Sequence, residues 1–144
     1  MVRTHFCALL ILASSMVHAG PRFHDATQDA GIYFAHVNGA NGQKFVIETV
    51  GPGGGFFDYD GDGWLDLYFV NSAGPGALYH NEGDGNFTDK TASAGVADSG
   101  YGLGTAAADY DGDGDLDLYI TCYGPHILYR NEGGCHFTEA TGEA

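Results

Sequence analysis

Two stretches of the chain read FFDYDGDGWLDLYFVN at residues 56–71 and AADYDGDGDLDLYITC at residues 107–122. Their aspartates recur at a spacing of 51 residues. The corresponding pairs are Asp58 and Asp109, Asp60 and Asp111, Asp62 and Asp113, and Asp66 and Asp117. A recurrence of this kind indicates that one supersecondary unit is stacked more than once, and it decides the fold class before any single element is considered.

Further elements recur around each acidic stretch. ALYHNEGDGNFTD at residues 77–89 matches ILYRNEGGCHFTE at residues 127–139, at a spacing of 50. Residues 23–32 and 87–96 share an opening Phe and a later Ala-Gly step, and residues 137–144 begin a third copy of this element. The unit is therefore about 50 residues long, with two copies nearly complete and the next one begun. Residues 36–43, an insertion rich in Asn and Gly, are expected to form a loop.

Each unit has the local pattern of short β-strands. Aromatic and β-branched residues alternate or run together at residues 64–70 and 115–121, and shorter strands are predicted at residues 77–81, 127–131, 86–88 and 136–138. The small residues at 53–57 and 104–108 predict short buried strands that allow close approach. A helix is expected only at residues 92–97, as one turn. Four short strands per unit predict an all-β fold, with about two four-stranded blades of a β-propeller in this chain.

The chemistry of the chain is concentrated in the two acidic loops. Each reads Asp-x-Asp-x-Asp-Gly-x-x-Asp, with aspartates at positions 1, 3, 5 and 9, and together with Asp115 they hold 9 of the 19 acidic residues. Carboxylates at alternate positions point toward one centre when the backbone curls, and the intervening glycines permit that curl through positive φ. Four carboxylates so close together cannot all ionise without a cation between them.

Calcium is the cation that these ligands fit best, because it takes six to eight oxygen atoms at about 2.3–2.6 Å with tolerant geometry. We expect two calcium sites, each formed by four aspartates, a water and the backbone carbonyl of position 7, which is Trp64 or Asp115. Zinc prefers nitrogen and sulfur ligands, which the loops lack. An EF-hand is not predicted, because position 12 is Phe69 or Ile120 instead of Glu and a strand follows the loop. The alternative is a pair of solvated acidic turns.

The repeated motifs DYDGDGWLDLYFVN and LYHNEGDGNFTD, with the later Ala-Gly step, resemble the FG-GAP/VCBS repeats of integrin-α-like β-propellers. The resemblance covers nearly all of residues 21–144 and is closest to the secreted acidic CRTAC and ASPIC–UnbV group. It implies a structural calcium ion in the first hairpin of each blade and a role in extracellular or cell-surface recognition. Propellers of this family usually have seven blades, so the resemblance also implies a truncated propeller that needs its missing blades or self-association to close.

The net charge restricts the partners of the protein, and the N-terminal residues indicate its location. With 5 Lys and Arg against 19 Asp and Glu, the net charge of −14 disfavours nucleic acid and anionic membrane surfaces as partners. Arg3, the apolar run at residues 6–13 and the small residues before position 20 predict a secretory signal peptide at residues 1–19. The repeat region would then be residues 20–144 of a secreted protein, or of a periplasmic or cell-surface protein in a bacterium. No stretch is long enough to insert into a membrane.

Catalytic signatures are absent from the sequence, so we do not expect an enzyme. There is no Gly-x-Ser-x-Gly, no Walker lysine and no His-Glu-x-x-His, and the histidines after residue 20 have no paired spacing. The leading hypothesis is a binding or adhesion scaffold whose partner is an extracellular protein or a glycan. A lectin-like module, with Trp64 and Tyr101 stacking on sugars, and an accessory domain of a polysaccharide-processing enzyme remain alternatives.

The two cysteines after residue 20 are not predicted to bridge each other. Cys122 ends the second strand of its blade and Cys135 follows the third, which places them about one strand length, roughly 15 Å, apart. We expect two free thiols, or pairing with parts of the protein outside this chain.

Overall fold

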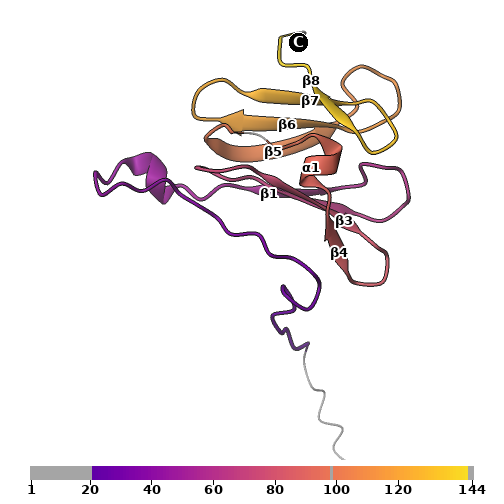
Figure 1. The fold of residues 1–144 in the computed structure, drawn as a ribbon, viewed down its shortest axis with the longest axis horizontal. Coiled ribbons are helices and arrows are strands. Elements are labelled where there is room, and N and C mark those ends of the chain that lie inside the picture. Colours follow the sequence, from indigo (N-terminus) through magenta and orange to yellow (C-terminus); the bar gives the residue numbers. More distant parts are fainter. Residues whose placement is uncertain (1–20, 98, 143–144) are drawn as a thin grey trace, which may run out of the picture.

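Two four-stranded antiparallel sheets form the molecule, and they are stacked face to face (Figure 1). The structure, a computed structural model, describes residues 21–97 and 99–142, so the predicted signal peptide lies outside the described residues. The first sheet contains β1 (Gly54–Phe57), β2 (Asp66–Phe69), β3 (Ala77–Asn81) and β4 (Phe87–Asp89). The second contains β5 (Gly102–Ala108), β6 (Asp117–Cys122), β7 (Ile127–Asn131) and β8 (Phe137–Glu139).

The strands follow one another in sequence order within each sheet, which is the meander of a propeller blade. Equivalent residues pair in both sheets: Tyr68 faces Leu78, and Tyr119 faces Leu128. The prediction of an all-β fold built from two four-stranded blades is confirmed. In the described residues the only helices are a 3-10 turn at Val46–Thr49 and α1 at Thr91–Ala94. Neither is long and apolar enough to span a membrane.

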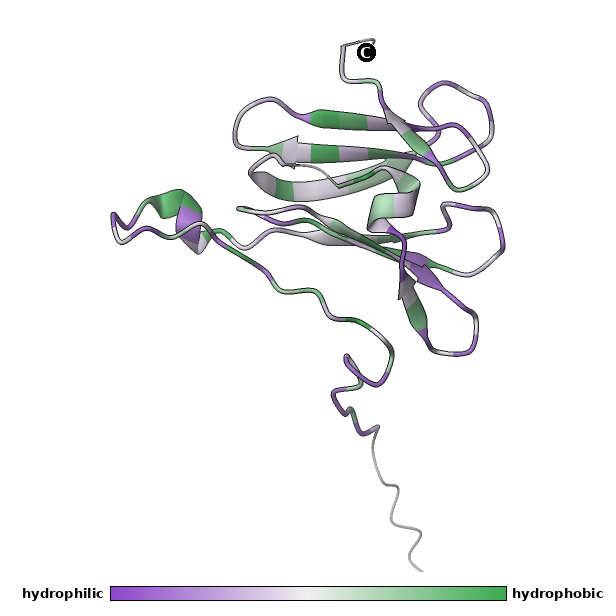
Figure 2. Ribbon diagram, viewed as in Figure 1, coloured by the Kyte–Doolittle hydropathy of each residue, from purple (hydrophilic) through white to green (hydrophobic). Residues whose placement is uncertain are grey.

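The main hydrophobic core lies between the two sheets. Its largest fully buried side chains come from both blades: Tyr68, Leu78 and Val70 on one side and Leu118, Ile120 and Phe137 on the other. Ala94 of α1 and Val96 enter the same cluster, so the connection between the blades is part of the core. Apolar colour accordingly follows the strands in Figure 2, whereas the loops that project from the sheets are hydrophilic.

A smaller cluster covers the outer face of the first sheet. Leu67, Ala77 and Tyr79 are buried there under Ile32 and Phe34 of the N-terminal segment. The ring of Phe34 stacks on Phe69 with a centroid distance of 4.8 Å. This segment runs along the side of the first sheet that faces away from the second sheet (Figure 1). It therefore occupies the place that a preceding blade would take.

The recurrent Ala-Gly step fastens each connecting turn to the outermost strand of the following blade. Gly31 and Gly95 have φ values of 81° and 80°. A Cβ atom on Gly31 would lie 2.6 Å from the carbonyl oxygen of Phe87, and one on Gly95 would lie 3.0 Å from that of Phe137. Both the left-handed conformation and the close approach to backbone require glycine at this step.

One detail of the strand prediction is wrong. Residues 53–57 and 104–108 do form strands, but most of β1 and the end of β5 are exposed rather than buried. β1 and β5 are the edge strands of their sheets and have a hydrogen-bonded neighbour on one side only. The exposure follows from their position at the edge together with their small side chains, which cover little of the sheet face.

The two blades are joined by a buried amide. Asn131 Nδ2 donates to the carbonyl of Tyr59 in the first blade at 2.7 Å and to that of Leu116 in its own blade at 3.2 Å. The equivalent residue of the first repeat, Asn81, donates to the carbonyl of Leu65 in its own blade at 2.9 Å. Both amide oxygens accept a backbone N–H two residues further on. The two asparagines therefore differ mainly by the contact between the blades.

We predict that Asn131→Ala lowers the free energy of unfolding by about 1–3 kcal/mol, because it leaves the buried carbonyl of Tyr59 without its donor. Asn81→Ala removes the same intrablade bonds at a more exposed position and is expected to cost clearly less. Urea unfolding of the two variants measures the difference. Equal losses would show that the bond between the blades contributes nothing to stability.

Candidate metal centre

The loop between β1 and β2 is held in a tight curl by its first aspartate. Asp58 Oδ1 accepts the backbone N–H groups of Gly61 and Asp62 at 2.8 and 3.1 Å, and Oδ2 accepts that of Gly63 at 2.9 Å. Gly61 and Gly63 have φ values of 74° and 91°, which only glycine adopts without strain. The sequence prediction that glycines permit the curl is confirmed here.

The loop between β5 and β6 repeats this arrangement atom for atom. Asp109 Oδ1 accepts the N–H groups of Gly112 and Asp113 at 2.7 and 3.2 Å, and Oδ2 accepts that of Gly114 at 3.1 Å. The same spacing of aspartates and glycines thus gives the same backbone path in both blades.

The aspartate at position 9 is buried in both loops and ties three segments together. Asp66 Oδ2 accepts the N–H of Tyr59 at 3.1 Å, and Oδ1 accepts that of Asn81 on β3 at 2.8 Å. In the second blade, Asp117 accepts the N–H of Tyr110 and that of Asn131, both at 2.8 Å. Each of these carboxylates links the start of its loop, its own strand and the next strand.

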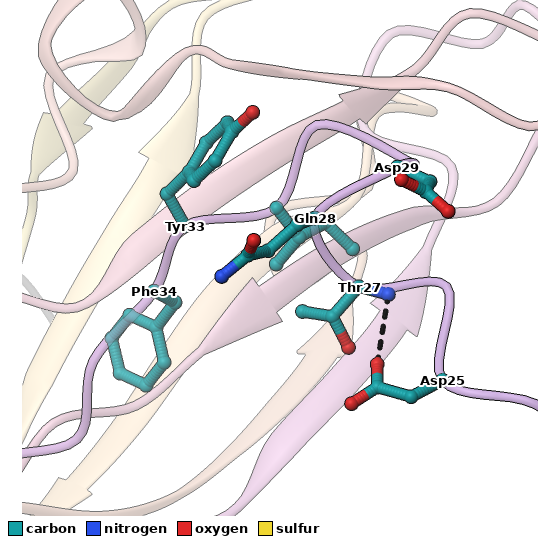
Figure 3. A pocket seen from close by; sticks show the side chains of 7 residues that line it. Asp25, Thr27, Gln28, Asp29, Tyr33 and Phe34 are labelled. Atoms are coloured by element: carbon teal, nitrogen blue, oxygen red, sulfur yellow. Dashed lines mark hydrogen bonds between the residues drawn. The ribbon is translucent and has the colours of Figure 1, made fainter.

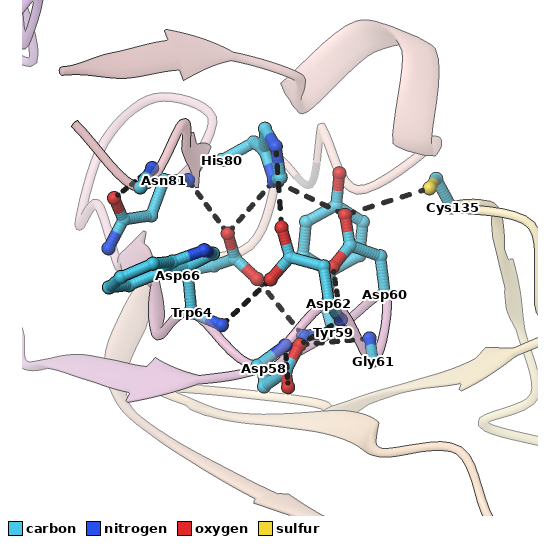
Figure 4. Close-up of polar contacts among 12 residues, drawn as sticks. Asp58, Tyr59, Asp60, Gly61, Asp62, Trp64, Asp66, His80, Asn81 and Cys135 are labelled. Atoms are coloured by element: carbon cyan, nitrogen blue, oxygen red, sulfur yellow. Dashed lines mark hydrogen bonds and ion pairs between the residues drawn. The ribbon is translucent and has the colours of Figure 1, made fainter.

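Three aspartates of each loop converge. One ligand oxygen of each of Asp58, Asp60 and Asp66 lies within 4.8 Å of the others, and the same holds for Asp109, Asp111 and Asp117. Figure 4 shows the carboxylates of the first loop facing one another above the curled backbone. The structure therefore brings together positions 1, 3 and 9 of both predicted sites.

The remaining predicted ligands are placed differently. Asp62 and Asp113, at position 5, accept the N–H two residues further on at 2.8 and 2.9 Å. The side chains of Trp64 and Asp115 lie against the next turn, beside Gly83 and Gly133 respectively. The contribution of the position-7 backbone carbonyl stays a prediction.

Sequence reasoning missed His80. Its Nδ1 lies 3.2 Å from Asp60 Oδ2 and 3.1 Å from Asp66 Oδ1, and its Nε2 lies 4.0 Å from Asp62 Oδ2 (Figure 4). The signal that could have found it is its position next to Asn81, on the strand that Asp66 binds. The equivalent residue in the second repeat, Arg130, instead pairs with Glu132 at 2.7 Å. The two loops therefore have the same backbone conformation but different side chains beside them.

The metal-free carboxylates carry an electrostatic cost. Burial raises the pKa of Asp66, although the N–H groups of Asn81 and Tyr59 act against this. In the second loop, desolvation raises the pKa of Asp111, and repulsion from Asp113, Asp117 and Asp109 adds to it. Like charges held close together disfavour ionisation, and a cation among them would remove that cost.

The donor set fits a hard divalent cation. The converging atoms are all carboxylate oxygens, which calcium and magnesium prefer. Asp58 Oδ2 and Asp66 Oδ2 each accept a single N–H group and keep a lone pair for a cation, whereas Asp58 Oδ1 already accepts two N–H groups. Calcium accommodates such a set more readily than magnesium because it tolerates irregular geometry.

A cavity of about 490 Å³ lies near the N-terminus, and its lining includes a turn that recurs in the first blade (Figure 3). Asp25 Oδ1 there accepts the N–H of Thr27 at 3.0 Å, and this bond and that of the Thr27 hydroxyl lower the pKa of Asp25. The equivalent pair in the first blade, Asp89 and Thr91, forms the same turn at 2.9 Å.

The cysteines behave as predicted with respect to each other. Cys122 is buried in the core, Cys135 is exposed, and no disulfide joins them. Cys135 instead lies beside the first acidic loop, with its Sγ 3.9 Å from Asp60 Oδ2.

Comparison with known proteins agrees with this architecture. Residues 58–120 match the family model of the FG-GAP-like repeat. A segment of 33 residues is 54% identical to cartilage acidic protein 1 from Homo sapiens, and it covers 23% of this chain and 5% of that protein. The predicted resemblance to FG-GAP repeats is confirmed, and the chain spans only a small part of the curated relative that it matches.

The pKa directions predict how the metal-free chain responds to pH. A carboxyl group whose folded pKa is raised destabilises the fold when ionised, so stability is lost as pH rises through the folded pKa and recovered as it falls toward the ordinary value of about 3.9. Asp66 and Asp111 are therefore expected to add stability when the chelated chain is acidified from neutral pH through this window, whereas Asp25 and Glu132, whose pKa values are lowered, act in the opposite direction. Asp111→Asn should reduce the stabilisation by acid, because it removes one of the two carboxyl groups with a raised pKa. Urea unfolding in chelator at several pH values measures this, and an unchanged slope in the variant would contradict it.

Proposed function

We propose that this chain, whose residues 58–120 match the FG-GAP-like repeat, is a secreted calcium-binding β-propeller protein that serves as an extracellular binding or adhesion scaffold, with calcium as a structural ion. The observation that carries the proposal is the convergence of three aspartates in each of two equivalent loops. The predicted signal peptide at residues 1–19 supports secretion. A scaffold is favoured over a catalyst because the converging carboxylates are accounted for as ligands.

In this proposal, the first ion is held by Asp58, Asp60 and Asp66, with Asp62 and the carbonyl of Trp64 as further ligands. The second is held by Asp109, Asp111 and Asp117, with Asp113 and the carbonyl of Asp115. The bound ion neutralises the carboxylates. Because Asp66 and Asp117 also bind the following strand, neutralising their neighbours stabilises the whole hairpin and not the loop alone.

Calcium is expected to bind at two sites and to stabilise the fold. Extracellular modules bind calcium with dissociation constants of about 0.1–1 mM, and a ligand at 100 times its dissociation constant adds about 2.7 kcal/mol per site. Calorimetric titration of the chelated chain, with circular dichroism in parallel, measures both effects. Asp60→Asn and Asp111→Asn are matched variants that each remove one converging charge. Each should weaken one site and leave the other; no calcium binding, or equal loss at both sites, would overturn the proposal.

The partners include a further blade, and the repeat itself indicates where that blade docks. Tyr68 is 0% exposed between the sheets, whereas its equivalent Tyr119 is 38% exposed on the open face of the second sheet. Tyr59 is 3% exposed and its equivalent Tyr110 is 42% exposed. The open face carries an apolar hollow of about 290 Å³ lined by Ala106, Ala108, Tyr110, Asp117, Tyr119 and Leu128. The same surface that binds the second blade in the first repeat is thus uncovered in the second.

In a solution of this chain only, the open face of the second sheet can pack against the first sheet of a second copy. That sheet offers Leu67, Phe69 and Tyr79, the equivalents of Leu118, Ile120 and Tyr129, once Ile32 and Phe34 are displaced. We therefore expect concentration-dependent self-association, measured by size-exclusion chromatography with light scattering. Tyr119→Asp should abolish it, whereas Tyr123→Asp, at an exposed tyrosine that does not line the hollow, should not. A chain that stays monomeric at high concentration would contradict self-association.

A further inference from the structure

Two positions at which the repeats differ come together in space. His80 of β3 stands where the second repeat has Arg130, and Cys135, in the turn between β7 and β8, stands where the first repeat has Gly85. Each exchange introduces a side chain that ligates metals. Both side chains line one cavity of about 320 Å³ at the junction of the blades, together with Tyr59, Asp60, Lys90, Ser93 and Gly134.

The distances between the donor atoms are short. Asp60 Oδ2 lies 3.2 Å from His80 Nδ1 and 3.9 Å from Cys135 Sγ, so the carboxylate stands between the imidazole and the thiol (Figure 4). Asp60, Asp62 and His80 place one ligand atom each within 4.8 Å of the others. This set differs from the calcium loop, because it contains nitrogen and sulfur as well as oxygen.

Cys135 adopts a conformation that favours glycine. Its φ is 66°, and Gly85 at the equivalent position has a φ of 94°. A non-glycine residue in the left-handed region is uncommon, and such residues gather at functional sites. The backbone of this turn is therefore strained at Cys135, the residue whose thiol lines the cavity.

We propose that Asp60, His80 and Cys135 form a second kind of metal site, which takes a borderline divalent transition metal such as zinc. Zinc prefers imidazole and thiolate ligands, whereas calcium prefers oxygen. The site joins the first blade, through Asp60 and His80, to the second, through Cys135. It goes beyond calcium binding by the loops, and it shares Asp60 with the first of the proposed calcium sites.

Two of the three donor pairs are close to the spacing that zinc requires. Bonds of about 2.0–2.2 Å to nitrogen and oxygen and about 2.3 Å to sulfur, in a tetrahedron, place nitrogen and oxygen about 3.3 Å apart and sulfur and oxygen about 3.6 Å apart. The observed 3.2 and 3.9 Å to Asp60 Oδ2 need shifts of only a few tenths of an ångström, whereas His80 and Cys135 must move closer to each other, because they do not belong to one group of ligand atoms within 4.8 Å. Water and Asp62 are available for the remaining positions.

Charge favours a cation at this place. Asp60 lines the cavity together with Lys90, and the carboxylates of Asp58, Asp62 and Asp66 converge with Asp60. The metal takes the place of the proton between His80 Nδ1 and Asp60 Oδ2, and the thiol of Cys135 loses its proton to solvent. Binding is therefore accompanied by proton release.

Cobalt(II) is the probe for this site, because its bond to a thiolate gives a charge-transfer absorption that oxygen ligands do not give. Titration of the full chain under reducing conditions should produce this absorption and saturate at one equivalent. Zinc should then displace the cobalt and should slow alkylation of Cys135, measured by peptide mapping, whereas calcium alone should not. Buried Cys122 is the internal reference for alkylation.

The repeat supplies the matched variants. His80→Arg and Cys135→Gly introduce the residues of the other repeat, and the second also relieves the strained φ, so neither is expected to unfold the chain. Each should weaken cobalt binding about tenfold or more, and Cys135→Gly should also remove the absorption. His136→Asn makes the same kind of exchange beside Cys135 and should leave the titration unchanged.

The results separate this site from the calcium loops. Cobalt binding by the wild-type protein without the thiolate absorption would overturn the site. So would a titration midpoint in His80→Arg and Cys135→Gly that equals the wild-type midpoint. Loss of binding in His136→Asn would also overturn it, because the neighbouring imidazole would then be the ligand. Calcium titration of Cys135→Gly should still show two sites. If wild-type protein bound cobalt as described but no calcium, the calcium proposal would fail and this one would stand.

Discussion

A buried carboxylate at the start of the second strand of each blade holds the rest of the structure in place. Asp66 and Asp117 have no contact with bulk water, yet both oxygens of each accept backbone N–H groups, one from the loop and one from the next strand. A buried charge is tolerated only when it is paired in this way. The loop, the hairpin and the third strand therefore form one unit, and the other carboxylates of the loop gather around it. A cation would offset the repulsion between these carboxylates and the cost of removing them from water.

Equivalent residues of the two repeats lie in different environments, one between the two blades and the other on an open face. Tyr68 and Tyr119 are equivalent by sequence and by register, but one lies in the core between the blades and the other on an open face. Asn81 and Asn131 show the same contrast in hydrogen bonding, since only the second bonds across the junction. Burial in a repeat protein is a property of the neighbouring unit as much as of the residue. The N-terminal segment covers the first sheet with Ile32 and Phe34 in place of a blade.

The residues that differ between the two copies include side chains that can bind a metal. At two positions the exchange introduces a metal-binding side chain: His80 stands where the second copy has Arg130, and Cys135 stands where the first copy has Gly85. They come from different blades and meet at Asp60, which belongs to the first acidic loop. In the second loop, Arg130 is paired with Glu132 instead. Two loops with one backbone geometry can thus differ in the ions they select.

The sequence by itself determined the number of blades, the order and approximate bounds of the strands, and the positions of the acidic loops, because these follow from local periodicity, turn residues and an exact repeat. It also assigned the backbone carbonyl of position 7, Trp64 or Asp115, as a ligand, which stays a prediction. Tertiary structure alone decided that Asp66 and Asp117 are buried, that parts of β1 and the end of β5 are exposed, and that His80 and Cys135 lie beside Asp60. Each of these depends on which strand or blade packs against which, and a contact between residues 75 positions apart leaves no mark on local periodicity.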